Sequence, residues 1–104
     1  MMEVKALMIL VSSGQFGELY NVLDSYSTII NESNIIIGIE ELEEFLTKFE
    51  NEVNSWIEKY GYESEQELIE DNIFSESEIE IVKYLKTILR DAKEKRYDFV
   101  WFCH

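Results

Sequence analysis

Apolar side chains recur at helical spacing along residues 42–60, and this run constrains the fold more than any other feature of the chain. Its members are Leu42, Phe45, Leu46, Phe49, Val53, Trp56, Ile57 and Tyr60. Steps of three and four residues place these side chains on one face of a helix of about five turns, which must be buried against other elements. Gly61 follows as a typical left-handed helix stop. The run therefore predicts one long amphipathic helix packed on a partner layer.

Three short segments have the composition of strands. Val4–Val11 is almost continuously apolar and rich in large aliphatic residues, which predicts a first strand covered on both faces. Ile35–Ile37 is too short and too β-branched for a helix and predicts a second strand. Tyr97–Cys103, which is strongly aromatic, predicts the third.

Three further helices are predicted from their start signals. Ser12 with Gln15 has the spacing of a capping box, and apolar residues then recur to Ile30, so a first helix is expected over residues 14–30. Ser64 with Glu67 predicts the start of a short helix near Glu65. Ser75 with Glu78 predicts a long helix from about Glu76.

The order strand, helix, strand, three helices, strand indicates an α/β or α+β protein, formed as a single domain over residues 1–104. We expect a small, three-stranded, mostly parallel sheet packed by about four helices. With the first strand at the centre, right-handed crossovers would place the first helix and the later helices on opposite faces. An antiparallel third strand is the open alternative.

The sequence argues against a membrane-spanning, secreted or disulfide-bonded protein. No apolar run approaches the roughly 18 to 20 residues that cross a bilayer, and the start of the chain lacks the pattern of a secretory signal. The single cysteine, Cys103, allows no internal disulfide, which favours a reducing compartment. We therefore expect a cytoplasmic protein that does not contact membranes.

Residues suited to catalysis or metal binding are few. Cys103 and His104 are the only cysteine and histidine, and they stand side by side. Zinc sites require three or four ligands, so neither a metal nor a cofactor is expected, and the chain is predicted not to be an enzyme. The turn Ser12, Ser13 and Gly14 follows a strand and opens a helix, as anion-binding turns do, but it lacks a P-loop lysine, and helix capping is the favoured interpretation.

Negative charge is concentrated in one stretch of the chain. The net charge is −13, from 22 acidic and 9 basic residues. Between Glu40 and Glu80 there are fifteen acids against Lys48 and Lys59, a balance of −13, so the rest of the chain is neutral. Acids in first turns of helices are stabilised by the helix dipole, but like-charged neighbours such as Glu67 and Asp71 repel one another.

A surface that tolerates such repulsion commonly meets a basic partner. We therefore expect a small acidic inhibitor that covers the nucleic-acid-binding surface of a nuclease or nucleic-acid-guided defence complex, as bacterial immunity proteins and phage anti-defence or anti-CRISPR proteins do. Direct nucleic-acid binding is excluded by the sign of the charge. The residues predicted to contact the partner are Tyr62, Glu63, Glu65, Glu67, Glu70, Asp71 and Phe74, with the aromatic residues as anchors.

A non-catalytic interaction or homo-oligomerisation module is the alternative. The apolar stripe of the last long helix is wider than one core contact requires, so this helix is either central in the fold or partly exposed for a partner, and in the second case the partner could be another copy of the chain. Ile81, Tyr84 and Ile88 are the residues predicted for that face.

Overall fold

The computed structural model describes residues 3–24 and 29–104 of the chain. The elements are, in order, β1 Ala6–Leu10, α1 Ser13–Leu23, β2 Ile29–Ile30, β3 Asn34–Gly38, α2 Ile39–Tyr60, α3 Glu65–Glu70, α4 Glu76–Glu94 and β4 Phe99–Cys103. The fold is α+β, and the described part of the chain forms four helices, three strands of five residues and the two-residue strand β2.

The sheet is mixed, with strand order β1-β4-β3-β2. β1 runs parallel to β4, whereas β3 runs antiparallel to both β4 and β2. The prediction of a mostly parallel sheet is therefore wrong, and the first strand is not central, because β4 lies between β1 and β3. The last strand is antiparallel to β3 but parallel to β1, so the alternative of an antiparallel last strand holds for one of its two neighbours. In the turn after β2, the Asn31 side chain accepts hydrogen bonds from the backbone N–H groups of Ser33 and Asn34 at 2.9 and 3.0 Å, which supports the antiparallel return of β3 along β2.

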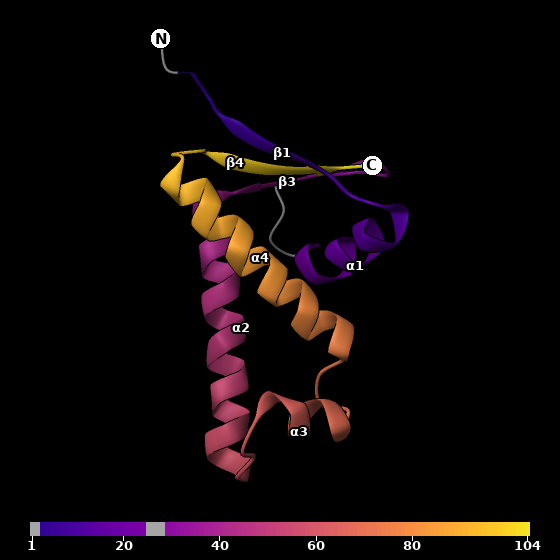
Figure 1. Ribbon diagram of the computed structural model, residues 1–104, viewed down its shortest axis with the longest axis vertical. Helices are drawn as coiled ribbons and strands as arrows, with labels where there is room; N and C mark the ends of the chain where they lie inside the picture. The colour runs from indigo at the N-terminus through magenta and orange to yellow at the C-terminus, as the bar shows by residue number, and fades with distance from the viewer. Residues whose placement is uncertain (1–2, 25–28) are drawn as a thin grey trace.

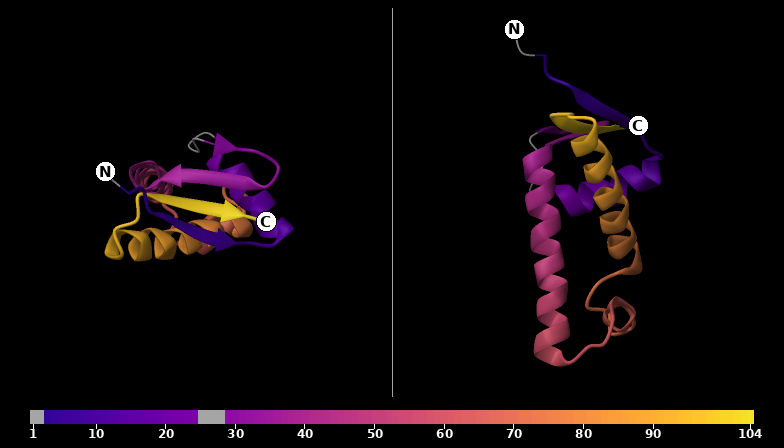
Figure 2. Two further views of the ribbon diagram at one scale, coloured as in Figure 1. Left: turned by 90° about the horizontal axis from the view of Figure 1, so that it is seen from above. Right: turned by 60° about the vertical axis from the view of Figure 1, so that its left-hand side comes forward.

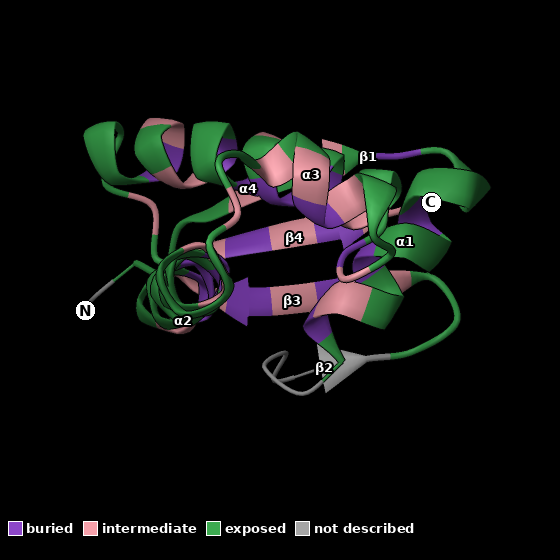
Figure 3. Cartoon of the chain, turned by 90° about the horizontal axis from the view of Figure 1, so that it is seen from below, coloured by how far each residue is buried: buried purple, intermediate pink, exposed green. Residues whose placement is uncertain are grey.

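The helices all lie on one face of the sheet, which also corrects the expectation of helices on both faces (Figure 1). The view from above in Figure 2 shows the strands in front of the helices, with no described helix over the outer face. α2 lies below β3, and α4 lies on the side of β1 (Figure 3). The domain therefore has two layers, one of them an open sheet.

The first helix is shorter than predicted. α1 ends at Leu23, and Ile29–Ile30, taken from the sequence as the end of the helix, forms β2. Tyr26, another residue of the predicted helical pattern, lies outside the described residues. Aliphatic residues at helical spacing cannot be distinguished by spacing alone from a short helix followed by a short strand.

The helix starts and the end of α2 follow the sequence signals. The Ser12 hydroxyl accepts a hydrogen bond from the Gln15 N–H at 3.2 Å, and the Ser75 hydroxyl accepts one from the Glu78 N–H at 3.1 Å. Gly61 ends α2 in the left-handed region at φ 73°. α3 begins at Glu65 after Ser64, as predicted, but the Ser64 side chain makes no capping hydrogen bond. The Glu67 carboxylate accepts from the Glu63 N–H, so the two side chains do not form a capping box.

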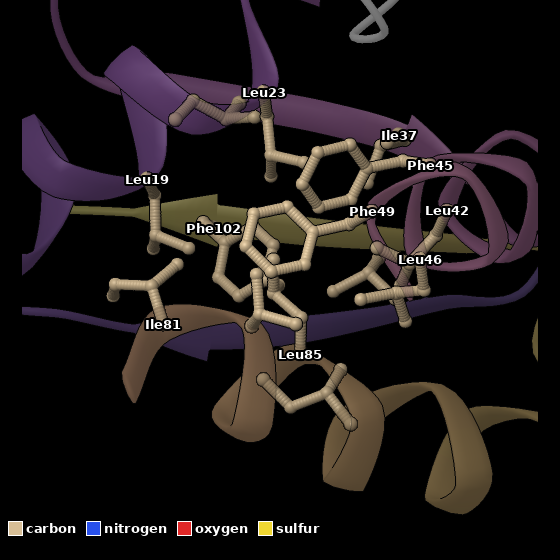
Figure 4. Close-up of a cluster of buried hydrophobic side chains, with 14 of the residues drawn as sticks. Leu19, Leu23, Ile37, Leu42, Phe45, Leu46, Phe49, Ile81, Leu85 and Phe102 are labelled. Carbon is tan, nitrogen blue, oxygen red and sulfur yellow. The ribbon is translucent and has the colours of Figure 1, made fainter. Parts of the chain in front are cut away.

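The core lies between the inner face of the sheet and the helix layer. Figure 4 shows Phe49 of α2 beside Phe102 of β4 and Leu85 of α4, with Phe45 directed toward Leu23 of α1. Leu85 and Phe102 are fully buried. The apolar face of α2 is thus buried from Leu42 to Val53, whereas Trp56 and Ile57 are half-buried and Tyr60, at the end of the predicted face, is exposed.

The first strand departs from its prediction in one further respect. Its inner residues Leu7 and Ile9 pack against the core, but on the outer face Met8 is 60% exposed and Leu10 is 82% exposed. β1 is therefore not covered on both faces. Its continuous apolar composition reflects an uncovered apolar surface rather than burial.

Candidate functional site

Eight of the fifteen acids between residues 40 and 80 lie toward the end of the molecule away from the sheet, whereas the other seven lie along α2, four of them in its first turns next to β3. The domain is elongated, measuring 52 × 27 × 20 Å, and α3 lies at the end opposite the strands (Figure 1). We call residues 61–80, which comprise the loop after α2, α3 and the first turn of α4, the acidic end. This segment contains eight acids and no lysine or arginine.

Apolar contacts fix α3 onto the two long helices. Leu68 of α3 is fully buried, and the Phe74 ring lies 5.3 Å from the Phe49 ring of α2, centroid to centroid. After α3 the chain turns through Asn72 at φ 60°, and the Ile73 N–H donates to the Leu68 carbonyl at 2.9 Å. This is a Schellman-type stop, in which asparagine takes the place usually held by glycine. The acidic end is therefore a folded, packed unit.

Two hydrogen bonds hold carboxylates of the acidic end in place. The Tyr62 hydroxyl donates to Asp71 at 2.9 Å, and the Glu63 N–H donates to the Glu67 carboxylate at 2.6 Å. The pKa of Tyr62 is raised, first by its hydrogen bond to Asp71, then by burial and by the charges of Asp71 and Glu67. The raised pKa is consistent with negative charge gathered around this hydroxyl.

The structure brings the seven residues predicted for partner binding into one region, but it does not expose all of them. Glu63, Glu70 and Asp71 are exposed. Tyr62, Glu65 and Glu67 are half-buried. Phe74 is only 6% exposed and belongs to the core, so its prediction as an aromatic anchor is wrong. Tyr62 is the one aromatic residue of the predicted set whose side chain remains accessible.

The basic residues of α4 face a different part of the surface. Lys86, Arg90 and Lys93 line a shallow groove between α2 and α4, together with Glu43 and Glu50. Lys93 forms an ion pair with Glu43 across this groove. Near the acidic end, Lys83 lies 3.9 Å from Glu65. The positive charge of these α4 residues is therefore partly balanced by acids of the same chain.

A second group of acids lines a hollow between α1 and α4. The hollow has a volume of about 280 Å³, and Glu18 and Glu78 lie on its wall with Phe45 and Ile81. The pKa of Glu78 is raised, first by burial and then by the charge of Glu52 on α2. Within residues 3–24 and 29–104, no group of three or more acidic, histidine or cysteine side chains could hold a metal ion.

The residues predicted for an oligomer face lie mostly in the core. Ile81 is 5% exposed and Ile88 is 7% exposed, while Tyr84 is half-buried. The width of the apolar stripe on α4 has a structural cause: the helix contacts both α1 and α2. The expectation that Ile81 and Ile88 form an exposed face is therefore wrong.

The other residues that the sequence offered for catalysis or ligand binding make contacts within the fold. Cys103 Sγ lies 3.7 Å from the Ile9 carbonyl oxygen, and His104 contacts the Phe16 ring and the Glu32 carbonyl. The side chain of Ser12 caps α1, as described above. Sequence analysis missed the outer face of the sheet, because the signal that could have revealed it, the unbroken apolar run of the first strand, was interpreted as burial.

No helix in the described part of the chain is both long and apolar enough to span a membrane. Comparison with known proteins finds no matching family model, curated protein or solved structure.

Proposed function

We propose that this chain is a small cytoplasmic inhibitor that uses its acidic end to cover the basic nucleic-acid-binding surface of a nuclease or a nucleic-acid-guided defence complex, in the manner of immunity and anti-defence proteins of bacteria or phages. It acts by occupying that surface and performs no catalysis. The observation that carries the proposal is the gathering of eight acids, without a single lysine or arginine, in the acidic end.

Preorganisation supports this proposal. Leu68 and Phe74 anchor the acidic end to the long helices, so its carboxylates are presented on a rigid support. A rigid charged surface loses little conformational entropy on binding, and complementary potential accelerates the encounter with a basic partner. Tyr62 adds an accessible aromatic ring beside Asp71, and aromatic residues are common in energetically important contacts.

The separation of charge along the molecule also supports it. The groove between α2 and α4 carries both signs of charge, whereas the acidic end carries one. A basic partner is therefore attracted to one end of the domain and is oriented by it.

The test is inhibition of nucleic-acid cleavage by a panel of purified nucleases and nucleic-acid-guided effectors. The variant Glu63→Lys, Glu70→Lys and Glu76→Lys reverses three exposed acids of the acidic end. The control Glu3→Lys, Glu40→Lys and Glu94→Lys makes the same change in net charge at exposed positions outside the acidic end. We expect the first variant to lose inhibition by tenfold or more and the control to retain it.

Salt provides the second arm of the test. Raising NaCl from about 50 mM to about 500 mM shortens the Debye length severalfold and should weaken the inhibitory complex steeply. The proposal fails if the panel is not inhibited, or if an inhibited enzyme responds equally to both variants and is insensitive to salt.

A further inference from the structure

We propose that the outer face of the sheet is the interface of a homodimer, in which two copies stack sheet against sheet. This inference is independent of the inhibitor proposal, because it concerns the end of the molecule opposite the acidic end. It follows from which side chains lie on the outer face, from the position of the charges, and from the absence of described helices over that face.

The register of the strands identifies the side chains of the outer face. The fully buried Val100 and Phe102 point inward from β4, so the alternate residues Phe99, Trp101 and Cys103 point outward. Met8 pairs with Trp101 and Leu10 pairs with Cys103 on β1, and Ile36 pairs with Trp101 on β3. The outer face is consequently an apolar surface running across three strands.

This surface carries no charge. None of the strands contains an aspartate, glutamate, lysine or arginine. The polar outward side chain on these strands, Asn34, is occupied within the fold, because its carbonyl oxygen accepts a hydrogen bond from Trp101 Nε1 at 2.6 Å. Soluble domains usually place polar residues on an uncovered sheet face, so an apolar one marks an interaction surface.

Charge determines which partner fits this face. A basic partner gains nothing from a neutral apolar surface, whereas a second copy of this chain, with its net charge of −13, must avoid bringing its acids close to those of the first. The sheet lies at one end of the 52 Å long axis and the acidic end lies at the other (Figure 1). Stacking two copies through their sheets therefore places the acidic ends at opposite extremes of the dimer, many Debye lengths apart. Glu40, Glu41 and Asp98 are the acids that stay near the interface, because they lie beside Phe99 at one end of the strands.

The area of the outer face indicates how strong the dimer is. Four strands about 4.8 Å apart, three of them about 17 Å long, give a flat projection of roughly 300 Å² per copy, and interlocking side chains bury more than that. Stable interfaces bury roughly 800 Å² per partner. We therefore expect a weak dimer that forms at micromolar concentrations or above.

The principal test is the mass of the full chain by sedimentation equilibrium across a concentration series. The most exposed outward side chains are Met8 and Leu10, at 60% and 82%, so Met8→Lys with Leu10→Lys should be tolerated by the monomer and should weaken dimerisation tenfold or more. The matched control is Tyr20→Lys with Tyr60→Lys, which adds the same two charges at exposed apolar residues, 42% and 57% exposed, on α1 and at the far end of α2. Dimerisation of this control should be unchanged.

Quenching of Trp101 distinguishes stacking from other modes of association. In a Trp56→Phe background, Trp101 fluorescence should shift to the blue and become less accessible to acrylamide as the dimer forms. Raising NaCl should leave the dimer unchanged or strengthen it, because salt screens like charges, which is opposite to the response expected of the inhibitory complex.

Three results would overturn the proposal. The first is a chain that stays monomeric up to about 1 mM in low and high salt. The second is a dimer that survives the Met8 and Leu10 substitutions. The third is a dimer in which amide exchange slows at Ala6, Met8 and Leu10 while Trp101 remains fully quenchable. The backbone groups of Ala6, Met8 and Leu10 point to the free edge of β1, so this result would mean that the copies join edge to edge and not face to face.

Discussion

Glu78 is the residue whose environment most clearly opposes its charge. It lies in the first turn of α4, where negative charge is favoured by the helix dipole, yet it is half-buried beside the hollow that Glu18 also lines. Burial and the nearby charge of Glu52 raise its pKa above the ordinary value of 4.5. The folded protein thus holds this proton more tightly than the unfolded chain does.

This linkage predicts the effect of pH. The stabilising contribution of protonated Glu78 is complete below the ordinary pKa and is lost as the pH rises through the raised value, so the free energy of unfolding falls over that interval. Glu78→Gln should be more stable than the wild type at pH 7, and the difference should disappear below about pH 4. Urea denaturation at several pH values measures this, with the exposed Glu76→Gln as control. Equal stability of wild type and Glu78→Gln at pH 7 would contradict the prediction.

At the scale of elements, α3 is the least self-sufficient helix. It has six residues, and isolated helices of this length do not form in water. Its stability comes from Leu68, which is fully buried, and from the Schellman-type turn through Asn72. α3 therefore depends on tertiary contacts, and Leu68 is its one fully buried side chain.

Leu68→Ala should consequently lower the free energy of unfolding by about 2 to 5 kcal/mol, because it removes buried methyl groups and leaves a cavity. Amide exchange should accelerate first within residues 63–74. Gln66→Ala, on the exposed side of the same helix, is the control and should change stability by less than about 0.5 kcal/mol. A Leu68→Ala variant as stable as the control would show that α3 is held by other contacts.

At the scale of the whole molecule, the acidic end and the apolar outer face of the sheet lie at opposite ends. The acidic end has charges of one sign close together, and their repulsion is strongest at low ionic strength. The melting temperature should therefore rise between about 10 mM and about 150 mM NaCl, as the Debye length falls from about 30 to about 8 Å. The variant Glu63→Lys, Glu70→Lys and Glu76→Lys, with a net charge of −7, should show a smaller rise. A melting temperature independent of salt would contradict this explanation.

Local patterns predicted most of the elements. The spacing of Leu42 to Tyr60 and the position of Gly61 defined α2, and the Ser12 and Ser75 signals defined the starts of α1 and α4. Arg96 shows the limit of such signals: it ends α4 in the left-handed region at φ 59°, although its residue type gives no indication of this. The bond from the Tyr97 N–H to the Ala92 carbonyl closes that turn and is visible only in the fold.

The candidate site was predicted only in part, because some of its features are local to the chain and others depend on the fold. The sequence by itself determined that the negative charge lies between residues 40 and 80, with seven of its fifteen acids on α2 and three on α3, because charge and short-range spacing are properties of the chain. Only the tertiary structure decided that Phe74, Ile81 and Ile88 are buried, that β3 runs antiparallel, and that β1 lies at an edge with one apolar face uncovered. Burial and strand order depend on contacts between residues far apart in the chain. An apolar residue looks the same in the sequence whether the fold buries it or leaves it exposed at an interaction surface.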